Sequence, residues 1–227
     1  MIKNERLKLI ADSVREGVTV CDVGTDHAII PVELILSRRT PKCIITDISA
    51  PSLEKGVENA KKTGVIDAVE SYCTNGTLGV KLDSRMDFII AGMGGELIAE
   101  ILEQDERLKS PEHRFILQPM SKAEVLREYL AKSGFEVVKE EKVKASARLY
   151  SVITCVYDGK QRTVKEKDIL LGYFADANSA LDIEYAKRLL KSLEVKLKGL
   201  ELASSSGEIE ISELKQSVKT VEEFLNK

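Results

Sequence analysis

The first 160 residues alternate short apolar runs, rich in β-branched side chains, with stretches whose apolar residues recur at helical spacing. This alternation predicts a doubly wound sheet, because helices that follow parallel strands cover both of its faces. Parallel strands are expected at 18–23, 42–48, 68–73, 86–91 and 114–117. Helices are expected in the charged start MIKNERLKLIADS and at 27–39, 50–63 (closed by Gly64), 96–108 and 121–133 (capped by Ser121).

Two longer strand patterns, 136–143 and 148–157, follow back to back. A hairpin there would add one antiparallel strand to an otherwise parallel sheet. The predicted fold class is therefore α/β, a Rossmann-like sheet with one antiparallel strand.

The chain changes character after Asp158-Gly159, where strand patterns stop. Apolar residues then recur at helical spacing, which predicts a short helix at 168–175 and two longer ones joined by a turn at 204–207. The stripes of the longer helices are Leu189, Leu193 and Leu197, and Leu214, Val218, Val221 and Leu225. Two domains are therefore expected: 1–160, and a helical, coiled-coil-like hairpin at 161–227.

The net charge of −3, from 34 basic and 37 acidic residues, argues against a generally basic nucleic-acid coat protein. No apolar run approaches the roughly 18 residues that a membrane span needs, and the charged start differs from a signal peptide. A soluble, cytoplasmic protein is expected, with a monomer favoured and no membrane partner. Four dispersed cysteines in strand-like runs predict reduced, buried thiols and no metal site.

Polar or glycine-rich residues directly follow each predicted parallel strand. Ligands of open α/β sheets bind at these carboxyl ends. The loop after the first strand is no dinucleotide fingerprint, since only Gly24 of the three glycines is present and Asp26 would repel a diphosphate. Asp22 and Asp26 instead favour a cationic cofactor without phosphate, and S-adenosylmethionine, with its sulfonium and ammonium groups, fits that description. The alternative is that both aspartates only cap the following helix.

The loops after the second and third strands carry candidate nucleoside contacts. Asp47, 25 residues after Asp22, stands where such folds place an acid on ribose hydroxyls, although it could be only a turn residue before Ser49. Asn75 could bind the edge of an adenine, although Asn-Gly is also a common turn.

Three glycines in IAGMGGE (90–96) follow the apolar 86–91 run. Alanine would serve packing better, so Gly92, Gly94 and Gly95 predict close backbone approach to a ligand or positive φ. A plain helix-entry turn is the alternative. Gln118 and Pro119, after the next strand, are expected to line the same pocket.

Together these residues resemble the TrmK family, bacterial tRNA (adenine-N1)-methyltransferases that act at position 22 in the D-arm. DVGTDHAIIP (22–31) looks like the family's motif D-[IV]-G-[ST]-D-H-A-x-L-P, and IAGMGG (90–95) and ILQP (116–119) match its later motifs. The resemblance implies a class I methyltransferase sheet with a C-terminal helical hairpin. The chain departs from the family at Ile29, Asn75 and Met120, where Tyr, Asp and Asn are usual. Tyr72 or Tyr150 could substitute for the missing Tyr in stacking on the target base.

The resemblance also implies roles for individual residues. Cofactor contacts are expected from Asp22, Gly24, Thr25, Asp47, Ile48, Asn75, Gly76, Ala91, Gly92 and Met93. Substrate contacts are expected from Gly94, Gly95, Gln118 and Pro119. The implied reaction is direct methyl transfer to N1 of an unpaired adenine. Asp26 would stabilise the charge that methylation places on the ring, with His27 as second catalytic candidate or as a helix-start hydrogen-bonding residue.

The implied partner is tRNA, which would meet a basic surface. The candidate residues for that surface are Arg6, Lys8, Arg15, Arg38, Arg39, Lys42, Lys142, Lys144 and Arg148. Three rival functions remain open: a methyltransferase with another acceptor, a dinucleotide oxidoreductase, which the missing glycines disfavour, and an inactive methyltransferase fold that only binds RNA.

Overall fold

The computed structural model describes residues 2–202 and 208–227 and divides the chain into two compact units, Met1–Arg162 and Thr163–Lys227. The first unit holds a seven-stranded sheet of order β3-β2-β1-β4-β5-β7-β6. Its strands are β1 (Thr19–Val23), β2 (Cys43–Asp47), β3 (Val69–Cys73), β4 (Met86–Gly94), β5 (Arg114–Ser121), β6 (Phe135–Ala145) and β7 (Arg148–Tyr157). Only β7 runs against the others in this described sheet, which confirms the predicted α/β class with one antiparallel strand.

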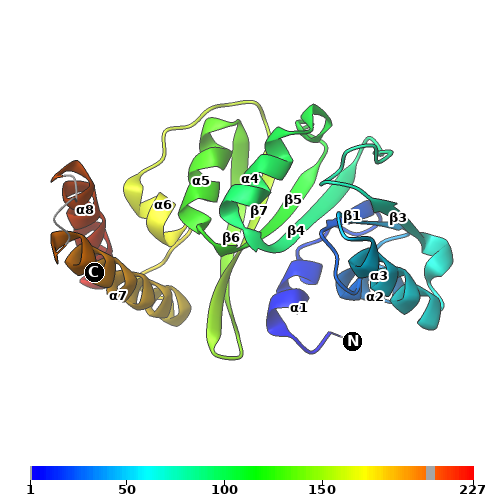
Figure 1. Ribbon diagram of the computed structural model, residues 1–227, viewed down its shortest axis with the longest axis horizontal. Coiled ribbons are helices and arrows are strands. Elements are labelled where there is room, and N and C mark those ends of the chain that lie inside the picture. Colours follow the sequence, from blue (N-terminus) through cyan, green and yellow to red (C-terminus); the bar gives the residue numbers. More distant parts are fainter. Residues whose placement is uncertain (1, 203–207) are drawn as a thin grey trace. The chain divides into compact units, whose positions relative to one another are not determined.

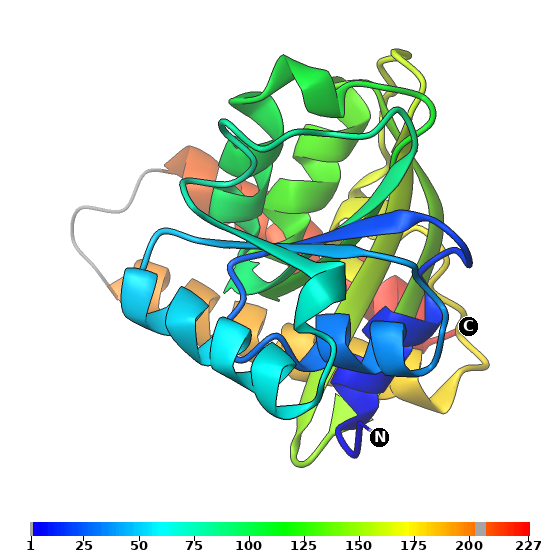
Figure 2. The same cartoon turned by 90° about the vertical axis from the view of Figure 1, so that its right-hand side faces the viewer.

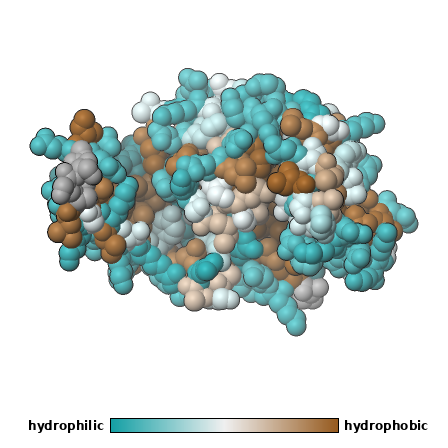
Figure 3. Space-filling model, viewed as in Figure 1, coloured by the Kyte–Doolittle hydropathy of each residue, from teal (hydrophilic) through white to brown (hydrophobic). Residues whose placement is uncertain are grey.

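Helices cover both faces of the sheet (Figure 1). One face carries α4 (Gly95–Glu103) and α5 (Ala123–Lys132), and the other carries α1 (Glu5–Asp12), α2 (Ile29–Leu36) and α3 (Ala50–Lys62). Figure 2 shows the second group, coloured blue to cyan, on the opposite side from the green α4 and α5. In Figure 3 hydrophilic residues lie around much of the drawn face, and apolar residues gather in patches between them.

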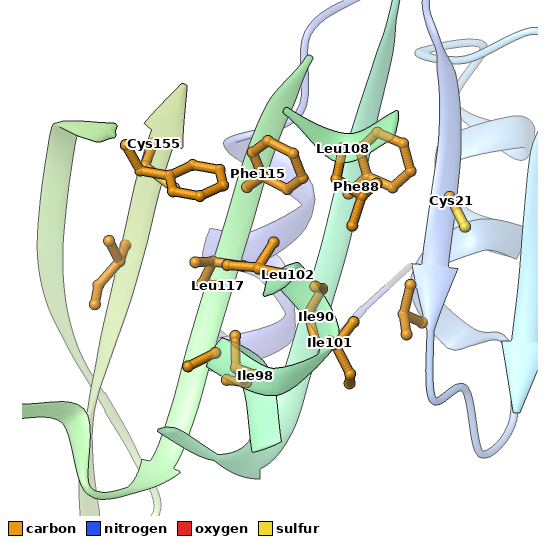
Figure 4. Packing of buried hydrophobic residues seen from close by; sticks show 14 of the residues in the cluster. Cys21, Phe88, Ile90, Ile98, Ile101, Leu102, Leu108, Phe115, Leu117 and Cys155 are labelled. Carbon is orange, nitrogen blue, oxygen red and sulfur yellow. The ribbon is translucent and has the colours of Figure 1, made fainter. Parts of the chain in front are cut away.

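The main core lies between the sheet and the α4–α5 layer. Phe88 and Ile90 of β4 and Leu117 of β5 face Ile98 and Leu102 of α4 (Figure 4), all fully buried. Ile89, between Phe88 and Ile90, packs instead into the cluster on the α1–α2 face. A central strand buried on both sides therefore needs a continuous apolar run, as the sequence predicted for β4.

Three predicted helices have different bounds in the structure. The 96–108 pattern splits into α4 and a 3-10 turn, η2 (Glu106–Leu108), because the Asp105 side chain caps the Arg107 N–H. The 121–133 helix begins only at Ala123, and Ser121 does not cap it, because β5 stays paired with β4 as far as Ser121. The 27–39 helix begins at Ile29, because Ala28 has a left-handed φ of 49°.

Three of the four cysteines, Cys21, Cys43 and Cys155, are buried free thiols as predicted. The prediction was wrong for Cys73, which is exposed because it ends β3, a strand with few buried side chains. Burial raises the pKa of each of the three buried thiols.

The second unit contains α6 (Glu166–Leu171), α7 (Ala180–Leu202) and α8 (Glu208–Leu225). The helix expected at 168–175 lies earlier because Gly172, at φ 103°, ends α6. Leu171, Ala186, Val221 and Phe224 form the core of this unit, with Leu189, Leu193 and Leu225 packed against it. The predicted turn at 204–207 lies outside the described residues. No described helix is both long and apolar enough to span a membrane.

Candidate active site

A cavity of about 300 Å³ lies at the carboxyl ends of β1 and β4. The chain runs outward from β1 through β2 to β3 and then returns to β4 on the other side of β1, so this is where strand order reverses. The loop after β1 forms most of the wall, Ala91 and Gly92 of β4 another part, and Arg6 and Leu7 of α1 the rest. The site therefore stands where an open α/β sheet places its ligand.

Backbone and hydroxyl groups hold the loop after β1 at its two ends. The N–H groups of Gly24 and Thr25 donate to the Thr46 carbonyl at 2.8 and 3.1 Å, and Thr25 Oγ1 accepts from Ala28 N at 3.1 Å. Gly24 has a φ of 74°, so a side chain there would be strained. Neither Asp22 nor Asp26 caps α2, which removes that alternative for both.

Asp22 is the buried carboxylate of the site. It lies on β1 between Ile45 of β2 and Ile89 of β4 and is 9% exposed. Burial raises its pKa to about 6, the hydrogen bond from Thr25 opposes the rise, and the charge of Asp47 adds to it. Because burial and a neighbouring negative charge disfavour ionised Asp22, a cationic ligand beside it would stabilise the carboxylate.

Replacing Asp22 by asparagine should raise the free energy of unfolding of the ligand-free protein at pH 7.5 by roughly 2–3 kcal/mol. The reason is that folding raises the pKa of Asp22 from 3.8 to about 6, so the ionised carboxylate disfavours the folded state. The gain should appear as pH rises from about 4 to about 6 and vanish below, where the carboxyl is protonated in both states. Urea unfolding at several pH values measures it, with the exposed Asp67→Asn as control. A gain that does not depend on pH would contradict the assignment.

Asp26 and His27 lie at the mouth of the cavity. The Asp26 carboxylate is 68% exposed, with Lys55 Nζ at 3.3 Å from Oδ1 and His27 Nε2 at 3.5 Å from Oδ2. The His27 carbonyl accepts from Asn59 Nδ2 at 2.8 Å, which fastens the loop to α3. Both side chains are accessible to a substrate that enters from solvent.

Asp47 is the last residue of β2, and its Oδ1 accepts from Ser49 N at 2.7 Å. One carboxylate oxygen of Asp47 therefore stabilises the turn before α3, as the turn alternative predicted. Among the described residues no hydrogen bond is recorded to Oδ2. The next residue, Ile48, is an apolar side chain left 76% exposed. A carboxylate oxygen beside an uncovered apolar side chain suits the ribose and flat base of a nucleoside.

The loop after β3 is positioned by residues that sequence patterns did not single out. Asn75 Nδ2 donates to Gln104 Oε1 at 3.1 Å. Gly76 has a φ of 61°, and its carbonyl oxygen accepts from Thr46 Oγ1 at 2.8 Å. A Cβ on Gly76 would lie 2.5 Å from Gln104 Nε2. Because its Nδ2 is engaged, Asn75 offers an oxygen to a ligand. Gln104 gave no sequence signal, since it is 29 residues away.

The glycines after β4 differ in what they do. Gly92 has a φ of 83° at a bulge between Ala91 and Met93, as the positive-φ prediction required. Met93 lies over Gly24, where a Cβ would come within 2.0 Å of Met93 Cε. The expectation that alanine would pack better than glycine was wrong for Gly95, because a Cβ there would lie 2.1 Å from the Lys122 carbonyl oxygen. Gly95 thus lets α4 approach the start of α5, and Gly94 precedes it with an ordinary φ of −68°.

The expectation that Gln118 and Pro119 line the cavity was wrong, because both are buried behind its wall. Gln118 Nε2 donates to the Pro119 carbonyl at 2.8 Å. Its Oε1 accepts from Arg6 Nη1, and the Arg6 guanidinium lies 5.3 Å above the Tyr150 ring. Tyr150 thus stands beside the cavity wall. Tyr72 instead packs against the main core and donates to Glu70, away from that wall.

Several basic residues expected to face tRNA already have partners within the protein, some buried and some at its surface. Arg15 is paired with the buried Asp87 at 2.7 Å, and Arg39 donates to the carbonyls of Val14 and Asp12. Lys42 pairs with Glu70 at 2.8 Å, and Lys142 is buried beside Glu140. Arg6 belongs to the cavity. Periodicity places these residues on helices and strands but does not reveal their partners.

The chain is similar to known proteins over this whole region. A family model with the description "Methyltransferase domain" matches residues 3–153. The tRNA (adenine(22)-N(1))-methyltransferase of Bacillus subtilis (strain 168) is 28% identical over 163 residues, 69% of this chain and 68% of that protein. A solved Streptococcus pneumoniae candidate tRNA (m1A22) methyltransferase, in complex with S-adenosyl-L-methionine, is 27% identical, with a TM-score of 0.85 over 99% of this chain and 100% of that one. The solved B. subtilis TrmK shares the fold, with a TM-score of 0.88 over 99% of both chains at 23% identity.

Proposed function

The chain belongs to the methyltransferase domain family, and from this premise we propose that it transfers a methyl group from S-adenosylmethionine to N1 of adenine 22 in tRNA. This is the activity that the TrmK-family motifs imply and that its B. subtilis relative carries in its name. The observation that carries the proposal is the cavity at the ends of β1 and β4, with a buried carboxylate at Asp22 and a left-handed turn at Gly24.

The residues present fit the proposed cofactor. Asp22 and Asp26, which line the cavity, supply negative charge for its cationic groups. Residues at the neighbouring strand ends, outside the cavity lining, would hold the nucleoside: Asp47 offers an oxygen for ribose hydroxyls, and Ile48 and Asn75 offer an apolar face and an acceptor for the adenine. The other proposed cofactor contacts act through backbone groups and close packing; they are Gly24, Thr25, Gly76, Ala91, Gly92 and Met93. When bound, S-adenosylmethionine supplies an electrophilic methyl group on its sulfonium.

The chain's part in the reaction is to position the target base and stabilise charge. N1 lies on the pairing edge of adenine, so the base must leave its stack before it can enter the site. Asp26, exposed at the mouth, accepts a hydrogen bond from the exocyclic amine and stabilises the positive charge of the methylated ring. His27 is the alternative for this role. Gly94 is proposed to line the base subsite, and the buried Gly95, Gln118 and Pro119 to support that subsite from behind through packing and hydrogen bonds.

The two units divide the work in this proposal. Residues 1–160 bind cofactor and target base, and the helical residues 161–227 bind the body of the tRNA. The remaining basic candidates, Lys8, Arg38, Lys144 and Arg148, would contact phosphate. Because the proposed substrate is tRNA, we propose a cytoplasmic location. That the protein is a monomer stays a prediction.

The deciding experiment incubates the protein with labelled S-adenosylmethionine and unmodified tRNA, then maps the methylated nucleoside. Label in 1-methyladenosine at position 22 supports the proposal, and label elsewhere or none overturns it. A tRNA with guanine at position 22 is the substrate control. A chain ending at Arg162, assayed in parallel, tests the hairpin: full activity of that chain would show that residues 163–227 do not serve tRNA.

Replacing Asp47 by alanine should weaken cofactor binding by about 1–3 kcal/mol, the scale of a lost charge-assisted hydrogen bond. The fold should persist, because Asp47 stands at a strand end and the cap of α3 is the separate bond from Ser52 N to Ser49 Oγ, although the bond from Ser49 N to Asp47 is lost. Titration calorimetry with S-adenosylhomocysteine measures the change, and the exposed Asp67→Ala is the control. Unchanged affinity in the folded variant would remove Asp47 from the site.

A further inference from the structure

The walls of the cavity present one basic side chain among mostly acidic and neutral ones. Asp22 and Asp26 are its carboxylates, and Arg6 is the only lysine or arginine among the described residues that line it. Arg6 comes from α1, far in sequence from the loops that form the rest of the wall. An arginine that only contacted tRNA phosphates would not need to line this cavity. Its position therefore calls for an anionic partner inside the cavity.

The Arg6 guanidinium is held in place before any ligand arrives. Its Nη1 donates to Gln118 Oε1, and its Cζ lies 5.3 Å from the centre of the Tyr150 ring. Gln118 is itself fully buried and fixed by its bond to the Pro119 carbonyl. Nη1 also lies 3.9 Å from the position that a Cβ on Gly92 would take, beside the bulge of β4. An arginine braced in this way loses little further side-chain entropy when it binds an anion.

The proposed cofactor has the charges that such a wall would complement. Its sulfonium and ammonium groups match the two aspartates, but its α-carboxylate would be repelled by them. We propose that Arg6 binds this α-carboxylate through charge-assisted hydrogen bonds and so selects a donor with an intact amino-acid group. This inference rests on the proposed function and adds to it a specificity-determining residue outside the strand-end motifs.

The test is a cycle between residue and ligand, measured by calorimetry without turnover. S-adenosylhomocysteine carries the carboxylate, and S-adenosyl-3-thiopropylamine lacks only that group. Arg6→Ala should weaken S-adenosylhomocysteine about 10- to 100-fold, the scale of a hydrogen bond to a charged group, and leave the decarboxylated ligand within about twofold. Wild-type protein should itself prefer S-adenosylhomocysteine by a similar factor, a comparison that needs no variant.

Two further variants keep the result interpretable. Arg6→Gln can still donate to Gln118 Oε1, so it retains the brace but not the charge and should show the same ligand-selective loss. Lys3→Ala removes an exposed cation that precedes the same helix and lines a different cavity, and it should change neither affinity.

Equal losses for both ligands would overturn the inference and make Arg6 a brace for Gln118. Lost tRNA affinity with unchanged S-adenosylhomocysteine affinity would also overturn it and assign Arg6 to the nucleic acid. If wild-type protein binds neither small ligand, the proposed function itself falls. If it binds both equally, only the role of Arg6 falls.

Discussion

Replacing Asp26 by asparagine should lower the rate of methyl transfer by about 10²- to 10³-fold while changing cofactor and tRNA affinity little. Asparagine keeps the size of the side chain but not its charge. The carboxylate is 68% exposed and contacts Lys55 and His27, so the fold does not depend on it. Single-turnover methylation with both ligands saturating isolates the chemical step from binding.

A matched variant separates the carboxylate from its ion pair. Lys55→Gln removes the partner 3.3 Å from Asp26 Oδ1 but leaves the carboxylate, so it should react at nearly the wild-type rate. If Asp26→Asn also reacts at that rate, Asp26 is only a surface partner of Lys55. His27 would then be the next residue to replace.

Replacing Glu140 by glutamine should lower the free energy of unfolding by about 3–5 kcal/mol, the cost of leaving buried charge uncompensated. Glu140 on β6 is paired with Arg127 of α5 at 2.7 Å and with Lys142 at 3.2 Å, and all three side chains are buried. Arg127 also donates to Ser151 of β7 at 3.3 Å. This network anchors α5 to the hairpin that carries Tyr150 beside the cavity, so cofactor affinity should fall with stability.

The pH dependence identifies the charge as the cause. Burial acts to raise the pKa of Glu140, but Arg127 and Lys142 outweigh it and hold the pKa below its ordinary value of 4.5. The stabilisation is thus present above about pH 4.5 and is lost as pH falls through the lower folded pKa, so the difference from Glu140→Gln should shrink in acid. Urea unfolding at pH 7 and below pH 4 measures both.

The same chemical change at an exposed pair is the control. Glu128→Gln breaks its pair with Lys132, and the loss should stay below about 1 kcal/mol because both side chains are solvated. A Glu140→Gln variant as stable as Glu128→Gln would show that hydrogen bonding alone, which glutamine retains, holds the network.

Local sequence determined the order of strands and helices and the loops at which ligands bind. Apolar runs such as 88–90 predict strands. Asp22, Gly24 and Asp47 stand at the ends of such runs, so their place at one edge of the sheet follows from strand direction alone. The left-handed turn at Gly92 was predictable for the same reason, because a glycine after a buried strand signals an unusual φ.

Tertiary structure alone decided which side chains meet. Arg6 reaches Gln118 across 112 residues, Asn75 reaches Gln104 across 29, and Gly95 is required by the carbonyl of Lys122. Helix ends moved for the same reason: β5 continues to Ser121 because β4 lies beside it. Periodicity shows which face of an element is buried, but it holds no information about the partner that buries it. The single arginine in the wall of the cavity is held there by such a partner, Gln118.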